Sequence, residues 1–379
     1  MGAQLADRIT RVSTRRDSDE RMTRAGSWCV TIWSVGLLLV YGAAGVAGVT
    51  KLRQYWVDTE QFRQTRLAAM SAPAAGSGVP SSGTPVDVSV GIAVNRIGEF
   101  DLQQSAWTAD FDLWFRWRGD SVRPGESFGV VNGQTLSRER MEARADGDRR
   151  FERYRVTARL TKSVDPSRFP FADEVLLVEL EDAVHGIDTL RYVAEERGDD
   201  IGEPVAPQEL DITRSMTVVT THHYGRGREG VEPLPGGADA RSRFVLAVLV
   251  QPASGSIYLR MYQALFASVA IALIAFFIKP LHVDPRFGLG IGAFFAAIGN
   301  NMFVGTMVPS GGRITLSTMV NGVGLATIFF TLVQSAISLY FLDTRGQARL
   351  SRVFDQASFF VLLVGYVLVN VALVMAARP

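Results

Sequence analysis

Four long apolar stretches end this chain in close succession, at residues 258–278, 287–308, 316–342 and 357–377. Each is at least as long as the ~20 residues that a helix needs to cross the hydrocarbon core of a bilayer. A fifth apolar stretch, Ser27 to Thr50, follows an arginine-rich tail. The chain is therefore predicted to span a membrane, and its first apolar stretch is either a retained anchor helix or a signal peptide.

The region between the first apolar stretch and the last four shows the alternation typical of β-strands. From Trp107 to Trp117 every odd position is apolar, while most even positions are Thr, Asp or Arg. This is the period of a strand with one buried face. Related patterns occur at residues 86–94, 154–160, 175–180, 210–220 and 244–250. Short strands at regular spacing, separated by polar turns, predict a β-sandwich.

These patterns divide the chain into five predicted segments. A basic cytoplasmic tail (1–26) leads into an N-terminal transmembrane helix (27–50), and a juxtamembrane helix with a linker rich in Ala, Gly, Ser and Pro follows (51–85). A β-sandwich domain (86–256) precedes a four-helix transmembrane domain (257–379). The expected fold class is thus a β-sandwich followed by a four-helix transmembrane bundle, with one additional N-terminal transmembrane helix.

The basic loops predict an orientation. Short loops rich in Lys and Arg stay in the cytoplasm, and the basic segments here are the N-terminal tail, the turn Lys279–Arg286 and the loop Thr344–Arg352. This puts the N-terminus in the cytoplasm, and the β-domain and the C-terminus on the periplasmic or extracellular side. Arg greatly outnumbers Lys, as is typical of GC-rich bacterial genes, so the expected location is the inner membrane of a bacterium.

The composition argues against several other classes of protein. A formal net charge of +1 offers no concentrated cationic face for nucleic acid. The single cysteine, Cys29, lies within an apolar stretch, so neither an intrachain disulfide nor a thiolate metal cluster is expected. The 4 histidines lack metal-ligand spacing, and no nucleophile elbow or phosphate loop follows a predicted strand. We expect no catalytic activity, no metal and no cofactor.

Three local motifs accompany the order of a β-domain followed by four spans. They are the run Val88 to Gly119 with Trp117 and Asp120 at its end, the segment Phe169-Pro170-Phe171-Ala172-Asp173, and the stretch from Asp284 to Pro309. In this order and spacing, residues 86–377 resemble the pentameric ligand-gated ion channels, also called the Cys-loop receptor superfamily, in the prokaryotic form that lacks the Cys-loop disulfide. The additional N-terminal segment lies outside the resemblance.

The resemblance assigns residues 86–256 to ligand sensing, residues 257–379 to the pore, and the coupling between them to a loop containing Phe169, Pro170, Phe171 and Asp173. At this loop the chain departs from the family pattern. The acid expected directly after Phe171 is Ala172, and Val248-Leu-Val-Gln251 stands where the family places its arginine partner. Losing both members together is physically consistent, because one alone would leave a buried charge unpaired.

Small residues recur along one face of the second span after the β-domain. Gly288, Gly292 and Gly299 follow one another at helical spacing with Phe295 between them. Given the resemblance, this face lines the pore, and a ring of Phe295 closes it by dewetting. The residues expected along the pore are Gly288, Gly292, Phe295, Gly299, Met302 and Thr306. The alternative is helix packing through the Gly288-x-x-x-Gly292 pattern.

Two charges near the start of the same span bear on ion selectivity. A ring of Asp284 carboxylates at the cytoplasmic mouth would favour cations, whereas an outward-turned ring of Arg286 would oppose them. We expect cation permeation. The alternative is a solvated turn in which Asp284 and Arg286 neutralise each other.

The resemblance also places the ligand between subunits, under the hairpin Thr221–Arg241. This hairpin carries His222, His223 and Tyr224, which together with Trp114 of a neighbouring subunit would form a pocket for a cation or for protons. The alternative is a polar hairpin whose adjacent histidines point to opposite faces of the sheet.

Two functions are therefore open from the sequence. The first is a homopentameric channel for inorganic ions, gated from the periplasm by an unknown small ligand or by protons. The second is a non-conducting membrane sensor or scaffold with the same pentameric fold. In both, the partners are further copies of the chain and the lipid bilayer.

Overall fold

The computed structural model describes residues 24–71, 84–101, 103–161, 165–195, 210–224, 240–308 and 312–378. The chain divides into two compact units. The helical unit comprises Met1–Trp56, Ser167–Phe169 and Tyr258–Pro379, and the β unit comprises Val57–Pro166 and Pro170–Ile257. The basic tail, the Pro-rich linker and the tip of the hairpin predicted to cover a ligand lie outside the described residues.

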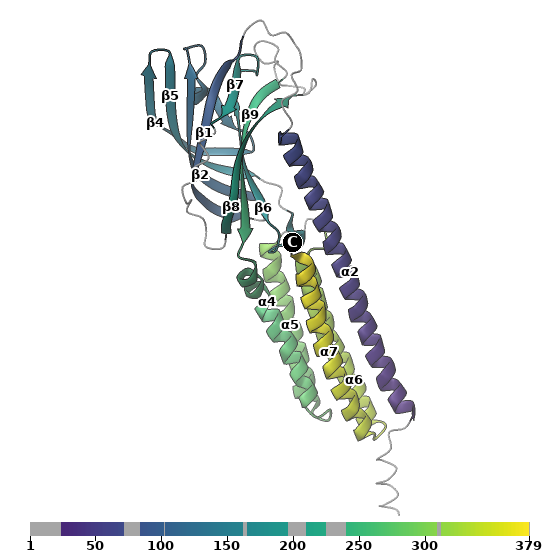
Figure 1. Cartoon of the computed structure of the whole chain (residues 1–379). Coiled ribbons are helices and arrows are strands. Elements are labelled where there is room, and N and C mark those ends of the chain that lie inside the picture. The colour runs from purple at the N-terminus through teal and green to yellow at the C-terminus, as the bar shows by residue number, and fades with distance from the viewer. Residues whose placement is uncertain are drawn as a thin grey trace, which may run out of the picture. The chain divides into compact units, whose positions relative to one another are not determined.

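Two sheets make up the β unit (Figure 1). The first is five-stranded, in the order β4-β5-β2-β1-β7, and β1 pairs in parallel with β7 while the other neighbours are antiparallel. The bounds of its strands are Val86–Asp101 for β1, Ala106–Arg118 for β2, Gly133–Asp146 for β4, Arg149–Thr161 for β5 and Leu190–Ala194 for β7.

The second sheet is four-stranded and antiparallel, in the order β3-β6-β9-β8. Its strands are β3 (Phe128–Val130), β6 (Glu174–Asp182), β8 (Leu210–His223) and β9 (Ala240–Pro252). Two short helices, α3 (Pro124–Ser127) and the 3-10 helix η1 (Pro166–Arg168), lie in the connections.

The alternation that predicts a strand at residues 107–117 is confirmed in β2. Trp107, Ala109, Phe111, Leu113 and Phe115 are each at most 1% exposed, because alternate side chains of a strand point to the same face. The five other predicted strand segments all lie within strands of the structure. The sequence pattern thus identified six of the nine strands in the described part of the chain.

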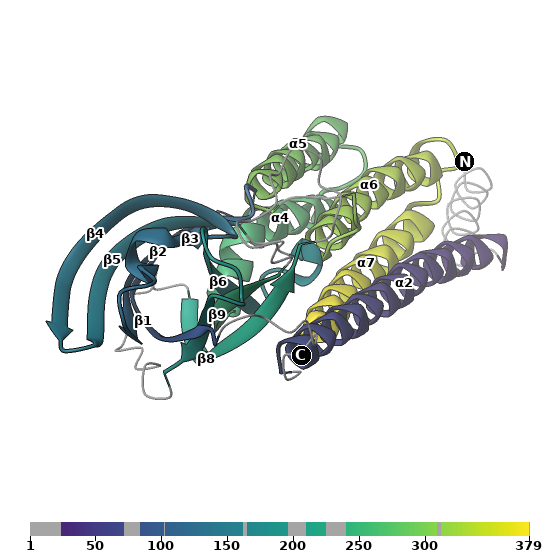
Figure 2. The same cartoon turned by 90° about the horizontal axis from the view of Figure 1, so that it is seen from above.

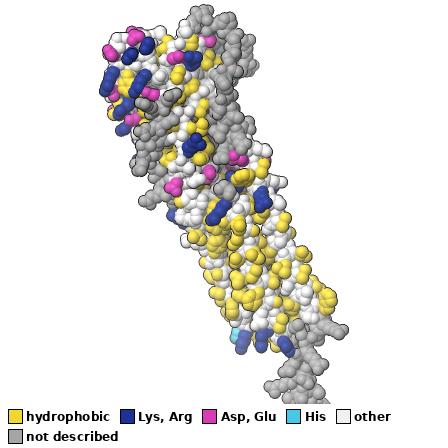
Figure 3. Space-filling view, in the orientation of Figure 1, with side chains coloured by type: hydrophobic (Ala, Val, Ile, Leu, Met, Phe, Trp, Pro, Cys, Tyr) yellow, Lys and Arg dark blue, Asp and Glu magenta, His cyan; other side chains and the backbone are white. Residues whose placement is uncertain are grey.

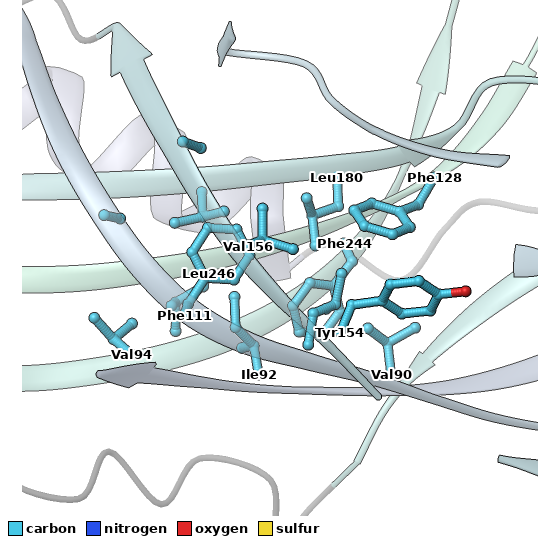
Figure 4. Packing of buried hydrophobic residues seen from close by; sticks show 14 of the residues in the cluster. Val90, Ile92, Val94, Phe111, Phe128, Tyr154, Val156, Leu180, Phe244 and Leu246 are labelled. Carbon is cyan, nitrogen blue, oxygen red and sulfur yellow. The ribbon is translucent and has the colours of Figure 1, made fainter. Parts of the chain in front are cut away.

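One hydrophobic core takes buried side chains from both sheets. Figure 4 shows Phe111, Ile92 and Val156 of the first sheet beside Leu180, Phe244 and Leu246 of the second. Aromatic rings cluster at one end, where the ring centroid of Phe115 lies 5.4 Å from Phe128 and 6.2 Å from Tyr192. Apolar burial of this extent is the main stabilising term for such a unit.

Five helices are long and apolar enough to cross a membrane, which indicates a transmembrane protein. They are α2 (Arg24–Ser71), α4 (Ser254–Ile274, continued by the 3-10 helix η2, Ala275–Phe277), α5 (Val283–Met307), α6 (Leu316–Asp343) and α7 (Ala348–Ala377). Figure 3 shows a broad band of hydrophobic side chains over these helices, with Lys and Arg gathered at one end of the helices. Exposed Lys279 and Arg345 lie in the α4–α5 and α6–α7 connections, and exposed Arg349 lies in the first turn of α7.

The N-terminal helix α2 packs on α6 and α7, and Figure 2 shows it running alongside α7. The Tyr41 hydroxyl lies 2.6 Å from the Thr327 hydroxyl, and the Trp33 ring lies 5.9 Å from Phe354. Glycines permit the close approach: a Cβ at Gly365 would lie only 2.7 Å from Tyr41, and one at Gly48 only 2.5 Å from Leu373. α2 continues without interruption to Ser71, so the segment predicted as a juxtamembrane helix is helical.

Candidate functional site

One face of α5 packs against the rest of the helical unit. Its buried residues recur at three- and four-residue steps, as expected for one side of a helix: Arg286, Gly290, Ala293, Ala297, Asn300 and Val304. Gly290 lies against Leu332 of α6, where a side chain on residue 290 would collide. The Asn300 amide donates to the Asn321 side-chain oxygen of α6 at 3.3 Å. Asn300 therefore bonds between helices, as residues of this type usually do inside membranes.

The residues predicted to line a pore lie on other faces of the same helix. Phe295 is 67% exposed and Met302 is 69% exposed. A Cβ at Gly288, Gly292 or Gly299 would meet no atom within 4 Å in this chain. Thr306 is also exposed. The small-residue stripe is therefore not used for helix packing within the described part of the chain, and its face is available to lipid, water or another copy.

Arg286 fits neither of the two possibilities considered from the sequence, an outward-turned side chain at the pore mouth and a solvated turn with Asp284. Its side chain is buried, with 1% of the residue exposed, and it donates to both Asp355 carboxylate oxygens of α7 at 2.8 and 3.0 Å. It also donates to Ser335 of α6 and to the Ile278 carbonyl oxygen. Gln334 completes the cluster by donating to Asp355 at 3.0 Å. We call Arg286, Ser335, Gln334 and Asp355 the buried polar cluster.

Asp284, two residues before Arg286, is exposed in the first turn of α5. A carboxylate there complements the partial positive charge of the helix N-terminus. Because Arg286 is committed to Asp355, it is not placed to neutralise Asp284. The sequence could have indicated that Asp355 has a buried partner such as Arg286, because a carboxylate within an apolar helix requires a cation or several donors nearby.

The hairpin residues predicted to bind a ligand form a polar network in the second sheet. The His222 ring lies 4.6 Å from the Tyr224 ring, and the Tyr224 hydroxyl donates to Glu181. Arg243 of β9 links Glu181 at 2.5 Å and Glu179 at 2.7 Å. His223, by contrast, is exposed.

Electrostatics in this network oppose a charged imidazole. The pKa of His222 is lowered, first by burial and then by the positive charge of Arg243, although Glu181 and Glu179 act in the opposite direction. The pKa of Tyr224 is raised by its burial and by its hydrogen bond to Glu181. His222 is thus neutral near pH 7 and turns cationic only under more acidic conditions.

Trp114 lies in the first sheet and has partners there. Its indole N–H donates to Glu195 at 2.6 Å, and Glu195 also pairs with Arg116 at 2.5 Å. The ring lies directly over Gly91 of β1, where a side chain would collide with it. Within the residues described for a single chain, no contact brings Trp114 to His222, His223 or Tyr224.

The loop predicted to couple the two domains is largely buried. Phe171 and Ala172 are 6% and 7% exposed, and Asp173 is partly exposed. The Pro170 carbonyl accepts from the Ser254 hydroxyl at the start of α4, at 2.8 Å. Ser167–Phe169 group with the helical unit, whereas Pro170–Ile257, Ser254 included, group with the β unit.

No protein-family model matches this chain, and neither does any curated protein. Among the described residues there is also no group of three or more His, Cys, Asp or Glu side chains that could hold a metal ion. The geometry of α5 and its surroundings is therefore the basis on which we infer a function.

Proposed function

We propose that this chain is one subunit of a homopentameric ion channel of the pentameric ligand-gated type. In this proposal the β unit is a β-sandwich that senses a periplasmic stimulus, and α5 lines a pore formed by five copies. The exposed small-residue stripe of α5 carries the proposal. A glycine within a helix costs about 1 kcal/mol relative to Ala, and Gly288, Gly292 and Gly299 gain no packing within the chain in return.

A central pore would explain why glycine occupies these exposed positions of α5. Five stripes facing one axis would leave a wide lumen at the glycines and a constriction at Phe295. Such an aromatic constriction blocks ions by excluding water. A lipid-facing surface would gain nothing from glycine, because a larger apolar side chain would bury more surface in the bilayer.

The charges at the start of α5 favour cations. With Arg286 neutralised by Asp355, the exposed Asp284 carboxylate is the charge of this turn that is free to attract ions. Five such carboxylates around one mouth would attract cations. The exposed basic residues of the α4–α5 and α6–α7 connections support a cytoplasmic position for this mouth, in the inner membrane of a bacterium.

The first test combines oligomeric state with conductance. The purified chain should form a pentamer by native mass spectrometry and should carry cation current in planar bilayers across a pH series and a ligand screen. Phe295→Ala should increase the resting conductance because it removes the apolar constriction. A matched control is Phe360→Ala on α7, whose side chain is similarly exposed at 62%, and it should leave the current unchanged.

Other outcomes would reject the proposal in different ways. A folded pentamer that stays silent under all conditions, including with Phe295→Ala, would support a non-conducting sensor or scaffold instead. A monomer or a non-cyclic assembly would exclude the pore. Equal effects of Phe295→Ala and Phe360→Ala would indicate that Phe295 faces lipid.

A further inference from the structure

A pocket of about 750 Å³ lies at one end of the five-stranded sheet. The ends of β1, β2, β4 and β5 line it, and five arginines are among its residues: Arg116, Arg118, Arg144, Arg149 and Arg150. Figure 3 shows dark blue Lys and Arg side chains, mixed with acidic ones, over this part of the β unit. Volumes of this size hold small-molecule ligands in proteins.

Strand register brings most of these arginines to one face of the sheet. Arg116 of β2 and Arg144 of β4 both pair with Phe151 of β5. Two residues further along each strand, Arg118 and Asp146 both pair with Arg149. Residues two apart in a strand share a face. This face is opposite to the one that buries Phe115 and Trp117 in the core. Phe151 provides an apolar floor between the guanidinium groups.

Two of the arginines are held in position by neighbouring acids. Arg116 pairs with Glu195 at 2.5 Å, and its guanidinium lies 5.4 Å from the centre of the Phe151 ring. Arg150 donates to both carboxylate oxygens of Asp120, at 2.9 and 3.1 Å. The remaining N–H groups of Arg116 are thus preorganised for a further acceptor, since a guanidinium carries five donors. Arg150 also donates to the carbonyl oxygens of Gly147 and Arg149.

Arg118 and Arg149 have no ion-pair partner within the described part of the chain, although they face each other across neighbouring strands. Like charges directly opposite each other destabilise a sheet. The acids of the pocket do little to offset them, because Asp87 is committed to Arg191 at 2.7 and 2.9 Å. Only Asp146 remains as an opposing carboxylate among the lining residues.

We propose that this pocket binds a small anion with two or more carboxylate or phosphate groups. Planar guanidinium groups bind both kinds of oxyanion through paired hydrogen bonds. A multivalent anion would bridge Arg118 and Arg149 and remove their repulsion, while Phe151 contacts its carbon skeleton or its ring. The proposal stands on the β unit alone and does not depend on whether the protein conducts ions.

Binding is tested by calorimetry on the full chain in detergent, with citrate and inorganic pyrophosphate as separate probes and acetate as a monovalent control. At least one multivalent probe should bind, more weakly at high salt because the contacts are ionic. Arg118→Gln with Arg149→Gln should weaken binding at least about tenfold. Arg214→Gln on β8, an exposed arginine without a partner among the described residues, should not change it.

A gain of affinity provides a second readout that damage to the fold would not produce. Asp146→Asn removes the opposing carboxylate and should tighten binding several-fold. Preference for citrate or for pyrophosphate assigns the ligand to carboxylates or to phosphates. The proposal is overturned if neither probe binds, or if the double arginine variant, with unchanged thermal unfolding, binds as tightly as Arg214→Gln.

Discussion

The two units of this protein differ in how many polar side chains their helices or strands bury beside the apolar ones. The core shared by the two sheets is built from apolar and aromatic side chains, and the charged side chains of β2 lie on the opposite face of its sheet. Helix α6, in contrast, buries a series of polar residues while presenting apolar ones such as Phe329 outward. Its buried polar residues are Ser317, Asn321, Thr327, Thr331, Gln334, Ser335 and Ser338.

This difference follows from the solvent of each unit. In water, burying apolar surface stabilises the fold, so the β unit places its apolar residues inside. In lipid, packing and hydrogen bonds between helices replace that driving force, and polar groups must find partners within the protein. The Tyr41–Thr327, Asn300–Asn321 and Ser338–Ser351 contacts are such partnerships. The comparison therefore predicts that polar substitutions matter most inside the helical unit.

The largest effect is expected at the buried polar cluster. Asp355→Asn leaves Arg286 charged and buried without its counterion, which should cost about 3–5 kcal/mol of stability. Thermal unfolding of the detergent-solubilised protein would measure the loss. Asp284→Asn, at an exposed position of the same end of α5, should lower the unfolding temperature only slightly, because it removes no more than a favourable charge at the helix N-terminus.

A compensating pair sharpens this prediction. Arg286→Met together with Asp355→Leu removes both charges and should recover most of the lost stability, because the desolvation penalty disappears with them. If the double variant is as unstable as Asp355→Asn, then shape and hydrogen bonding, rather than the unpaired charge, govern this region, and the contrast between the two units weakens.

A smaller effect is expected where α2 meets α6. Tyr41→Phe removes a buried hydrogen bond to Thr327, and hydrogen bonds between helices in membranes contribute about 0.6 kcal/mol on average. The variant should unfold at a slightly lower temperature than the wild type. Tyr340→Phe, whose side chain is 47% exposed, is the matched control and should have no effect. Equal stability of both variants would mean that apolar contacts alone hold α2.

The smallest effect is expected at His222, on the β unit. Because the pKa of His222 is lowered from 6.5 in the folded state, the unfolded chain binds a proton more readily than the folded one. Its contribution to stability is therefore fully present above pH 6.5 and is lost as the pH falls below that value. The pH dependence of unfolding should be slightly weaker in His222→Gln than in the wild type, and a stronger dependence would contradict the direction of the shift.

Much of the fold follows from local patterns. The alternation at Trp107–Trp117 identified β2, and the lengths of the apolar stretches identified the helices. β4 was missed because its residues are almost all exposed, so its sequence lacks the alternation of a half-buried strand. β7 was missed because it has only 5 residues. Both are specified by pairing with neighbouring strands, which leaves little trace in their own sequences.

The candidate site, too, follows partly from the local sequence and partly from the tertiary structure. The spacing of Gly288, Gly292 and Phe295 in the sequence already put them on one side of a helix. Only the packing of α5 on α6 left that side exposed, and only the fold joined Arg286 to Asp355, a residue 69 positions away. Helical and strand periodicity are local properties that a sequence records directly, whereas the partner of a buried charge depends on which distant segments pack together.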